Sequence, residues 1–447
     1  MRLLSLSLAG ALVAYLAYTI VPLFHRRLVV LGALRHYPED VFKKDPVVVI
    51  PDTVQCEDLH YHAQSGTIFT ACEDNFENRF KWFPPLANFD NPEAASKSQG
   101  SIHVIDPKTL QSRRLEFTNF ASPFITHGID VISDPTRPDG EAVYIFAVNH
   151  LPNPDFSPSA SPAVPRARSQ LELFHHVVGT ATVQHVRSIW HPLIRTPNDL
   201  FAASPTSVYV TNDHRHANHG LMRTMEDLYA GAKWTDVVHI RLDESLGTTT
   251  TTTASATDGV SASVALDNVH NANGLGHGRS PREMLLASCT SGLMHIGEVP
   301  DPAGTDGNKN PNITLRDAVT IDHVVDNPTY FADPYASNDD GGGAGDKSGF
   351  VIAGLSKAVD LSKTMRDVAA TEPVMVTYVT QKKKNEQGSG GKWEKRVLFE
   401  DDGSRLRSAS AAVLVGIDPA EEDGKRRAWL FVTGFLAKAV VAMKVDL

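Results

Sequence analysis

Short runs of β-branched and aromatic residues, bounded by turn residues, recur along the chain after about Pro46. Runs of this length and composition predict strands, and a long series of them predicts an all-β fold. Several runs end in a turn such as Ile105-Asp106-Pro107-Lys108-Thr109, which commonly links the outer strands of a propeller blade. The chain has neither a repeat of fixed period nor a Gly-His or Trp-Asp blade signature, which argues against the WD40 class. The predicted strands include residues 47–50, 66–71, 101–105, 142–148, 207–211, 237–242, 350–353, 374–379 and 429–432.

Apolar residues at helical spacing occur in two places. In residues 221–229 they stand at i, i+4, i+7 and i+8, which predicts a short helix, and residues 356–370 show a weaker pattern of this kind. Other segments are rich in Gly, Ser, Thr, Pro or charge and cannot form a core. Because apolar strands resume after each of them, we expect surface loops inserted into one domain: residues 152–169, 247–263, 300–311, 336–348 and 382–392.

The N-terminal part has a different pattern. Residues 3–24 carry no charge, and this stretch is long enough to cross a bilayer. A cleaved signal peptide is the alternative, but the small-residue run Ala9-Gly10-Ala11 comes too early for a cleavage site. We expect a membrane anchor and linker in residues 1–45, followed by a single catalytic domain in residues 46–447.

Composition narrows the function classes. The 447 residues carry 42 Lys and Arg against 52 Asp and Glu, and this net charge of −10 argues against a nucleic-acid binder. Three cysteines without a CxxC pair are too few for a disulfide scaffold and leave no cysteine zinc site. No pattern in the chain predicts a protein partner.

Several segments place Asp, Glu or Asn at turns beside apolar strands. Carboxylate and amide oxygens are the hard ligands that calcium prefers, although a single such residue most often closes a turn. No EF-hand loop is present, so a calcium site requires ligands from distant segments. A closed propeller brings such segments to one axial channel, because the inner strands of all blades face it. The segments are Cys56-Glu57-Asp58-Leu59, Pro197-Asn198-Asp199-Leu200, Thr211-Asn212-Asp213-His214, Asn271-Ala272-Asn273-Gly274-Leu275 and Val325-Asp326-Asn327-Pro328.

Two histidines stand at the ends of predicted strands. His127 precedes one strand and His150 follows another. A histidine at such a position is usually a hydrogen-bonded surface residue. Together the two can act as a catalytic general base, in which one imidazole orients the other and raises its basicity.

These segments resemble the serum paraoxonase/arylesterase family, whose members are calcium-dependent six-bladed propellers that hydrolyse lactones and aryl esters. The matching pieces follow the family's order from about Asp52 to the C-terminus, whereas the expected loops match nothing. The pair Asn198-Asp199 followed by Thr211-Asn212-Asp213-His214 is specific, whereas His127-Gly128-Ile129 alone is not. The remaining pieces are Cys56-Glu57-Asp58-Leu59, Val148-Asn149-His150, Leu171-Glu172-Leu173-Phe174, Ala272-Asn273-Gly274 and Val325-Asp326-Asn327.

The resemblance implies two calcium ions. The ligands that it implies for a catalytic ion are Glu57, Asn198, Asn273, Asp326 and Asn327. Those that it implies for a second, structural ion are Asp58, Asp199 and the backbone carbonyl of Ile129.

The resemblance also implies the catalytic groups. His127 and His150 correspond to the family's histidine dyad, and Asp213 with His214 corresponds to a nearby acid/base pair. The predicted helix at residues 221–229 falls where the family has an amphipathic lid over the channel mouth. A hydrophobic N-terminal helix is likewise a family feature.

The chain departs from the family pattern at three points. The family's disulfide joins the two ends of the chain, but no cysteine follows Cys289 here. Cys56 and Cys72 flank a predicted hairpin and either form a disulfide or remain two buried thiols. Asn271 replaces an aromatic residue of the pocket wall. These departures concern stability and substrate preference more than metal binding.

We expect a calcium-dependent hydrolase of small lactones and aryl esters, in which the metal polarises the carbonyl and the histidine dyad activates water. One alternative is a gluconolactonase-like propeller hydrolase, and another is a non-catalytic membrane-anchored scaffold stabilised by calcium. A zinc site in His214, His216 and His219 is a third alternative, although loop histidines at this spacing are usually solvated.

The sequence gives conflicting signals about the side of the membrane on which the catalytic domain lies. Arg26, Arg27 and Arg35 slightly outweigh Arg2 and the terminal amine, which favours a cytosolic domain by the positive-inside rule. The calcium chemistry and the glycosylation sequon Asn312-Ile313-Thr314 favour the other side. We expect a membrane-anchored domain in the lumen of the secretory pathway or outside the cell.

Overall fold

The computed structural model describes residues 14, 15, 18, 19, 21–37, 46–157, 159, 161, 164–243, 255–301, 311–336, 345–382 and 392–447. Most of the apolar stretch at residues 3–24 lies outside this part of the chain, as do parts of every expected loop. Among the described residues, no helix is both long and apolar enough to span a membrane.

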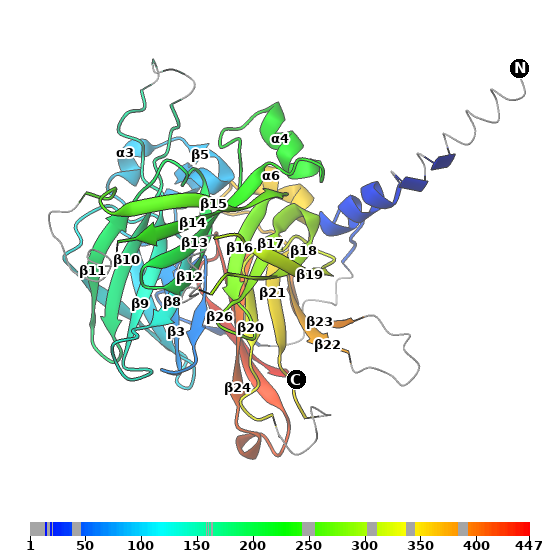
Figure 1. The fold of residues 1–447 in the computed structure, drawn as a ribbon. Coiled ribbons are helices and arrows are strands. Elements are labelled where there is room, and N and C mark those ends of the chain that lie inside the picture. The colour runs from blue at the N-terminus through cyan, green and yellow to red at the C-terminus, as the bar shows by residue number, and fades with distance from the viewer. Residues whose placement is uncertain are drawn as a thin grey trace, which may run out of the picture.

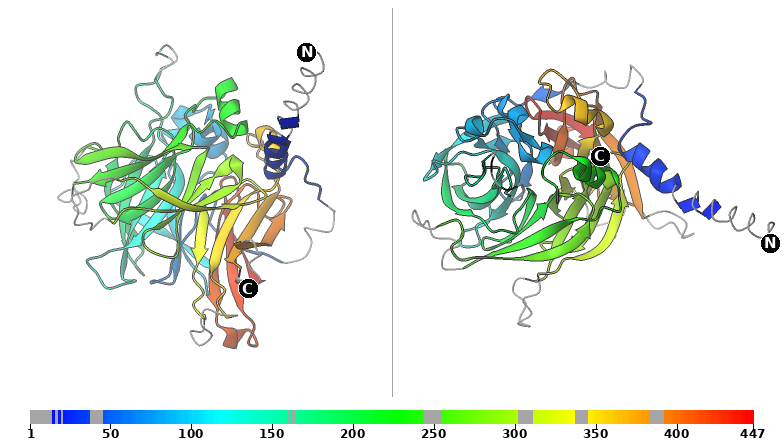
Figure 2. Two further views of the ribbon diagram at one scale, coloured as in Figure 1. Left: turned by 45° about the vertical axis from the view of Figure 1, so that its right-hand side comes forward. Right: turned by 90° about the horizontal axis from the view of Figure 1, so that it is seen from above.

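The strands form four sheets of four strands and one of eight, apart from a short two-stranded pair (Figure 1). In the eight-stranded sheet, two four-stranded units meet where β7 and β11 pair in parallel at their outer strands. The fold is therefore a propeller of six blades, as predicted. Seen from above, the blades follow one another around a ring (Figure 2).

Each blade begins with its innermost strand. The first two blades contain β2 (His60–His62), β3 (Thr67–Cys72), β6 (Ser101–Asp106) and β7 (Gln111–Thr118), then β8 (Thr126–Ser133), β9 (Ala142–Asn149), β10 (Gln170–Val177) and β11 (Thr182–Ile189). The third and fourth contain β12 (Pro197–Ser204), β13 (Ser207–Asn212), β14 (Thr235–Leu242) and β15 (Val260–Val269), then β16 (Ala272–His277), β17 (Glu283–Ser288), β18 (Leu293–Glu298) and β19 (Thr314–Thr320). The fifth and sixth contain β20 (Pro328–Phe331), β21 (Gly349–Leu355), β22 (Val374–Gln381) and β23 (Trp393–Asp401), then β24 (Ala409–Ile417), β25 (Arg427–Gly434), β26 (Val441–Asp446) and β1 (Val48–Val49).

The ring closes through hydrogen bonds between the two ends of the chain. β1 pairs with β26, so that Val48 lies opposite Ala442 and Val49 opposite Val441. Strand pairing therefore joins the first described strand to the last one. The innermost strands also contact one another in sequence, and β24 contacts β2.

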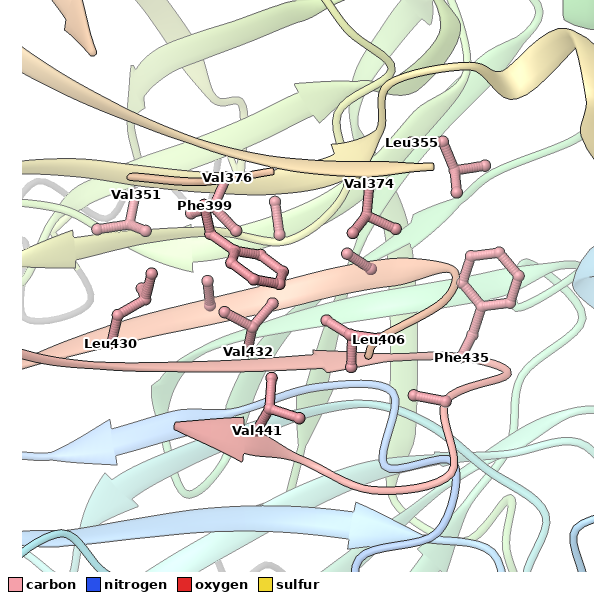
Figure 3. Packing of buried hydrophobic residues seen from close by; sticks show 14 of the residues in the cluster. Val351, Leu355, Val374, Val376, Phe399, Leu406, Leu430, Val432, Phe435 and Val441 are labelled. Atoms are coloured by element: carbon pink, nitrogen blue, oxygen red, sulfur yellow. The ribbon is translucent and has the colours of Figure 1, made fainter. Parts of the chain in front are cut away.

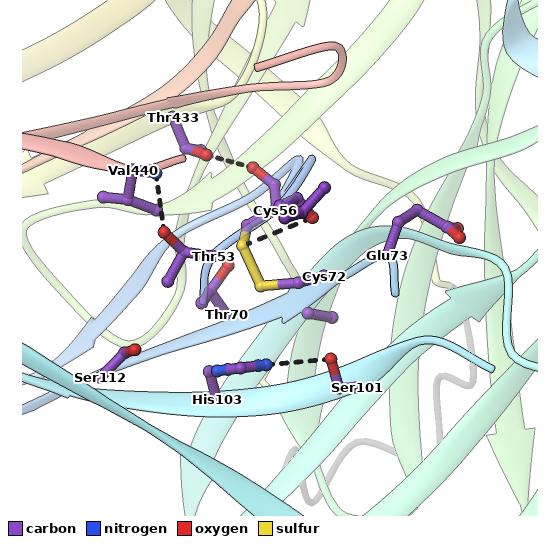
Figure 4. The surroundings of a disulfide bond; sticks show 12 residues. Thr53, Cys56, Thr70, Cys72, Glu73, Ser101, His103, Ser112, Thr433 and Val440 are labelled. Atoms are coloured by element: carbon purple, nitrogen blue, oxygen red, sulfur yellow. Dashed lines mark hydrogen bonds between the residues drawn. A yellow bond between two sulfur atoms is a disulfide. The ribbon is translucent and has the colours of Figure 1, made fainter. Parts of the chain in front are cut away.

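Cys56 and Cys72 form a disulfide, which resolves the two alternatives left open by the sequence. The bond joins the segment before β2 to the end of β3 (Figure 4). Thr433 Oγ1 donates a hydrogen bond to the Cys56 carbonyl, which links this segment to the last blade. The disulfide therefore holds the chain that carries Glu57 and Asp58.

Apolar side chains fill the spaces between neighbouring blades. Between the fifth and sixth blades, Val351, Val374 and Val376 pack against Leu430 and Val432, all of them buried (Figure 3). Alternating residues of each strand supply these contacts, which explains the β-branched runs in the sequence.

Short helices lie in the connections between strands. They are α2 (Asn78–Lys81), η1 (Pro84–Leu86), α3 (Pro92–Ala95), α4 (Leu221–Leu228), η2 (Cys289–Ser291), η4 (Ala358–Asp360), α6 (Leu361–Thr364) and η5 (Pro419–Glu421), with the small strand pair β4 (Trp82–Phe83) and β5 (Asn88–Phe89) beside η1. α4 and α6 lie at the same end of the propeller as the helix at residues 21–30 (Figures 1 and 2).

Two sequence predictions need correction. The helix expected at residues 356–370 is only η4 followed by the single turn of α6. The loop expected at residues 247–263 ends earlier, because β15 begins at Val260. α4 forms as predicted, but its buried residues are Arg223 and Glu226, and its apolar residues face outward.

Residues 26–37, here called the N-terminal strap, pack against the propeller before the predicted domain boundary. Arg26 Nη1 lies 2.6 Å from Asp322 Oδ1, and the Leu31 carbonyl accepts a 3.1 Å hydrogen bond from the Val359 amide. Val30 is fully buried in the cluster of Figure 3. The arginines that entered the orientation argument therefore make contacts with the folded domain.

Candidate active site at the upper hub

Most of the predicted site residues lie where the inner strands begin. Register breaks occur between Thr126 and Ile129 in β8, between Pro197 and Leu200 in β12, and between Ala272 and Leu275 in β16. These breaks contain the pairs His127-Gly128, Asn198-Asp199 and Asn273-Gly274. β-Bulges re-aim side chains away from the regular alternation. Three blades therefore direct chemistry-bearing residues to the same end of the channel.

Glycine permits the close approach of these segments. A Cβ on Gly128 would lie 2.4 Å from Asp199 Oδ1, and a Cβ on Gly274 would lie 2.5 Å from Asn327 Oδ1. Both distances are far below van der Waals contact. Packing at the hub therefore restricts positions 128 and 274 to glycine.

The structure brings together the residues implied for both calcium ions, a set that we call the upper hub. Asn327 Nδ2 donates a 3.1 Å hydrogen bond to Glu57 Oε1. Asp58 accepts hydrogen bonds from the Leu59 and Ile129 amides at 2.8 and 3.1 Å. The set consists of Glu57, Asp58, Asn198, Asp199, Asn273, Asp326 and Asn327.

The upper hub carries more negative charge than its neighbours offset. Burial, the largest cause, raises the pKa of Glu57, Asp199 and Asp326 well above their usual values and that of Asp58 to about 7. Mutual repulsion contributes, since Asp58 raises the pKa of the other three carboxyls. Such a cluster favours either protonation or a cation.

The predicted histidine dyad is assembled beside the hub. His127 Nδ1 lies 3.1 Å from His150 Nε2, and His150 Nδ1 lies 2.8 Å from Ser169 Oγ. Burial lowers the pKa of His127 well below its usual value and that of His150 to about 3. Both imidazoles are therefore neutral. His127 Nε2 is 3.9 Å from Glu57 Oε1, beyond hydrogen-bonding distance.

Asp213 and His214 lie next to the hub, directly after β13. Asn198 Nδ2 donates a 3.5 Å hydrogen bond to Asp213 Oδ2. His214 Nδ1 lies 3.0 Å from Asp213 Oδ1, and His214 Nε2 lies 2.9 Å from Asp227 Oδ1. Burial and Arg223 oppose a charge on His214, but the two carboxylates raise its pKa above the usual value.

A cavity of about 560 Å³ opens over these groups. Polar groups at one side include His127, Asn198, His214 and Asp326. The remaining wall is mostly apolar and includes Phe83, Leu86, Leu355, Met365 and Phe435. Its size and lining suit a small molecule with an apolar substituent.

Comparison with known proteins finds relatives among the serum paraoxonases. Mouse (Mus musculus) serum paraoxonase/arylesterase 1 is 24% identical over 245 residues, which cover 55% of this chain and 56% of the mouse protein. Chicken (Gallus gallus) serum paraoxonase/arylesterase 2 is 30% identical over 162 residues, covering 35% and 38% of the two chains. Rabbit (Oryctolagus cuniculus) serum paraoxonase/lactonase 3 is 23% identical over 249 residues, covering 55% and 56%. The chain resembles the serum paraoxonases.

The paraoxonase resemblance that the motifs indicated is thus confirmed. The match spans about half the length of these relatives. No protein-family model matches the chain.

Solved structures show weaker likeness. A luciferin-regenerating enzyme aligns with a TM-score of 0.43 at 10% identity, covering 90% of this chain and 96% of its own. Regucalcin, a calcium-binding protein from Agrobacterium tumefaciens, aligns with a TM-score of 0.39 at 9% identity, covering 88% and 91%. The blade count rests on the strand pairing described above.

The donor set fits the calcium ion that the paraoxonase resemblance implies. Glu57 Oε2, Asn198 Oδ1 and Asn327 Oδ1 are buried oxygens without a hydrogen-bond partner in the described part of the chain. Such atoms are rare in folded proteins, and carboxylate and amide oxygens are calcium ligands. Within the same residues, no three His, Cys, Asp or Glu side chains form a metal cluster, and this includes the zinc alternative at His214, His216 and His219.

Sequence reasoning missed several residues of the paraoxonase-like site. Ser169 hydrogen-bonds His150, and the Ser410 hydroxyl donates to the Glu57 carbonyl. The Phe83 ring packs edge-on against His127, with 5.0 Å between the ring centroids. Asp227 reaches His214 from α4. Asp227 stood in a predicted helix and Ser169 at the end of an expected loop, but neither was singled out as a site residue.

A second polar cluster lies further along the same inner strands. Asp130 Oδ2 is 2.8 Å from His277 Nε2, and Asp130 Oδ1 is 3.1 Å from His60 Nδ1. The Val131 and Ala202 amides also donate to this carboxylate, at 2.8 and 2.5 Å. We call His60, Asp130 and His277 the lower hub. Burial raises the pKa of Asp130, but the two histidines outweigh this and lower it below its usual value.

Proposed function

We propose that the protein is a calcium-dependent hydrolase of lactones and esters with apolar substituents. The observation that carries this proposal is the set of unpaired buried oxygens of Glu57, Asn198 and Asn327, which come from different blades and lie beside a neutral imidazole pair. The resemblance to serum paraoxonases supports the same reaction class.

The residues that would hold the catalytic ion are Glu57, Asn198, Asn273, Asp326 and Asn327. A structural ion would be held by Asp58, Asp199 and the Ile129 carbonyl. When bound, the catalytic ion supplies Lewis-acid polarisation of a carbonyl group. Its binding also offsets the repulsion that raises the pKa of these carboxyls.

The chain's own residues would activate the water. In the tautomer required, His127 donates Nδ1–H to His150 Nε2, and His150 donates Nδ1–H to Ser169 Oγ. His127 Nε2 then has a free lone pair and takes the proton of the water whose oxygen attacks the carbonyl carbon. The proton passes to the leaving alcohol oxygen as the acyl bond breaks.

The cavity wall indicates the substrate. Apolar side chains such as Phe83, Leu355 and Phe435 offer few partners for the hydroxyl groups of a sugar lactone. An alkyl lactone or an aryl ester would instead bury its apolar part against them. This wall disfavours the gluconolactonase-like alternative.

The proposal also places the catalytic domain in the lumen of the secretory pathway or outside the cell. Disulfides persist in oxidising compartments, so the Cys56–Cys72 bond supports a lumenal or extracellular domain. Calcium at the concentrations found outside the cytosol would load even weak sites. The apolar side chains that α4 exposes support contact with a membrane beside the predicted anchor.

Hydrolysis assays on the full chain in detergent test the proposal. We expect turnover of alkyl lactones and aryl acetates in calcium, loss of activity after chelation, and recovery when calcium returns. A preference for sugar lactones would select the gluconolactonase-like reading. Calcium-dependent melting without hydrolysis of any substrate would select the scaffold.

A further inference from the structure

A single arginine of the N-terminal strap holds the end of α4. Arg27 Nε donates a 3.0 Å hydrogen bond to the Leu228 carbonyl, and Arg27 Nη2 donates a 3.4 Å bond to the Asp227 carbonyl. Arg27 Nη1 donates to the Thr290 carbonyl, which belongs to η2. A cation at the C-terminus of a helix also interacts favourably with the helix dipole. The strap thereby ties α4 to the fourth blade.

α4 depends on such polar contacts for its position. It has only eight residues and no side-chain N-cap, and isolated helices of this length are unstable in water. Its apolar residues contribute little packing, since Leu221 and Leu228 are 77% and 52% exposed. Glu226 accepts hydrogen bonds from the Arg215 and His216 amides, which holds the helix from its other side.

The end of α4 contacts the candidate acid/base pair. Asp227 Oδ1 lies 2.9 Å from His214 Nε2, while Asp213 Oδ1 lies 3.0 Å from His214 Nδ1. Asp213 is in turn hydrogen-bonded to Asn198 of the upper hub. A continuous series of contacts therefore runs from Arg27 through Asp227 and His214 to the site.

We propose that Asp227 is a positioning residue for His214, and that Arg27 holds α4 where this contact can form. The inference rests on the proposed function and adds Arg27 to the residues that position that site. His214 is oriented through Nε2, which is hydrogen-bonded to Asp227, whereas Nδ1 lies 3.0 Å from Asp213 Oδ1 without forming a hydrogen bond. Removal of residues 1–45 would therefore take away both Arg27 and the Leu31 wall of the cavity.

The surroundings of His214 are consistent with a fixed imidazolium. Asp213 and Asp227 face its ring nitrogens, and Arg223 lies 3.4 Å from Asp227 Oδ2. His270 also packs beside this end of α4, with Nε2 2.8 Å from the Glu226 carbonyl and 3.1 Å from Arg27 Nη2. Its pKa is lowered to about 4, chiefly by burial, so it adds no charge. Cys289 and His219 are further titratable groups near Asp227. The pKa of the Cys289 thiol is raised well above its usual value and that of His219 is lowered, in both cases chiefly by burial.

Kinetic measurements on variants of Asp227, Arg27 and Arg26 distinguish the positioning of His214 from the general docking of the strap on the propeller. Asp227→Asn should lower kcat about 10-fold to 100-fold, and Arg27→Ala should lower it in the same direction, with KM changed less than kcat. Arg27→Lys should restore part of the loss. Arg26→Ala is the matched control, since Arg26 bonds Asp322 and the Gly292 carbonyl but not α4, and it should keep kcat. An equal loss in Arg26→Ala would overturn the proposal.

A mutant cycle with His214 provides the second test. In a His214→Gln background, neither Asp227→Asn nor Arg27→Ala should lower kcat further, whereas a general loss of folding would add to the effect. Histidine NMR on the full chain measures the contact without any substrate. The His214 pKa should fall in Asp227→Asn, and an unchanged value would refute the contact. If the wild type hydrolyses nothing, the proposed function fails, while this titration still decides whether Asp227 holds His214.

Discussion

The upper and lower hubs both contain buried carboxyl groups near the same axis, but their electrostatics are opposite. At the upper hub, Glu57, Asp199 and Asp326 repel one another and their pKa values are raised well above the usual ones. At the lower hub, Asp130 is shared by His60 and His277 and its pKa is lowered. Desolvation is the largest influence at both places. The difference therefore comes from the partners and not from burial.

This contrast distinguishes a site that is complete from one that needs a ligand. The lower hub supplies its own cation, and four donors satisfy the Asp130 carboxylate. The upper hub leaves oxygens of Glu57, Asn198 and Asn327 without partners. A charge cluster that the fold does not balance is relieved either by protonation or, as we propose, by a cation from solution.

The largest expected effect follows from removing one charge of the upper hub. Glu57→Gln should reduce hydrolysis to the background rate, because a neutral amide weakens calcium binding and the substrate carbonyl loses its polarisation. In chelator, the same variant should melt above the wild type, because it removes a repelling buried charge. Melting curves with calcium and with chelator, alongside activity, measure both effects.

The direction of the change in melting temperature in chelator is the decisive observation. A Glu57→Gln variant that is destabilised equally with and without calcium would show that Glu57 is a structural residue with no role toward a cation. Asp130→Asn serves as the matched carboxylate-to-amide control, because its partners belong to the chain.

A smaller loss is expected from the histidine dyad. His127→Gln should lower kcat about 10²-fold to 10⁴-fold if His127 accepts the proton of water, while calcium still raises the melting temperature. His62→Gln is the matched control, since His62 is also buried and hydrogen-bonded, to Ser65 and Ser133, but does not line the cavity. Initial rates across pH measure the effect, and an unchanged rate would remove the dyad from the mechanism.

The sequence predicted the fold because its signals are local. Strand runs, turn chemistry and apolar alternation are properties of neighbouring residues, and the runs at residues 142–148 and 374–379 became β9 and β22. The orientation of α4, in contrast, is not determined by neighbouring residues in the sequence. Its apolar residues have helical spacing, yet the polar face is the buried one, because Arg223 and Glu226 bond chain segments on either side of the helix.

The candidate site was predictable in part for the same reason. Asn-Asp, His-Gly and Asn-Gly pairs can be recognised in sequence, since the bulge chemistry lies within each pair. The lower hub could not be found this way. His60, Asp130 and His277 lie on three different blades, and none belongs to a motif with an unusual composition. Their meeting depends on the register of the whole ring.

The lower hub should contribute stability and not catalysis. Asp130→Asn leaves His277, whose pKa is raised in the folded protein, without its carboxylate, and we expect a loss of about 3 kcal/mol in the free energy of unfolding. Calcium should raise the melting temperature of this variant by as much as that of the wild type. Denaturant titrations in calcium and in chelator measure both quantities. A variant that no longer responds to calcium would show that the two hubs are one cooperative site.

The smallest effect is a difference in how the two hubs respond to pH in calcium-free protein. The pKa of Asp58 is raised to about 7, so its contribution to stability is present below its unfolded pKa of about 4 and is lost as the pH rises toward 7. Asp58→Asn should therefore gain about 1–2 kcal/mol relative to the wild type between pH 5 and pH 7. Asp130→Asn should respond to pH for a different reason. Asp130 has a lowered pKa and remains ionised throughout, but its removal lowers the raised pKa of His277, so the deficit of this variant should shrink as the pH rises from 5 to 7. Comparing each variant with the wild type cancels the buried histidines that do not contact the substituted carboxylate. With calcium added, the ion keeps Asp58 ionised and the slope for Asp58→Asn should disappear; a slope that persists would mean that no cation binds beside Asp58.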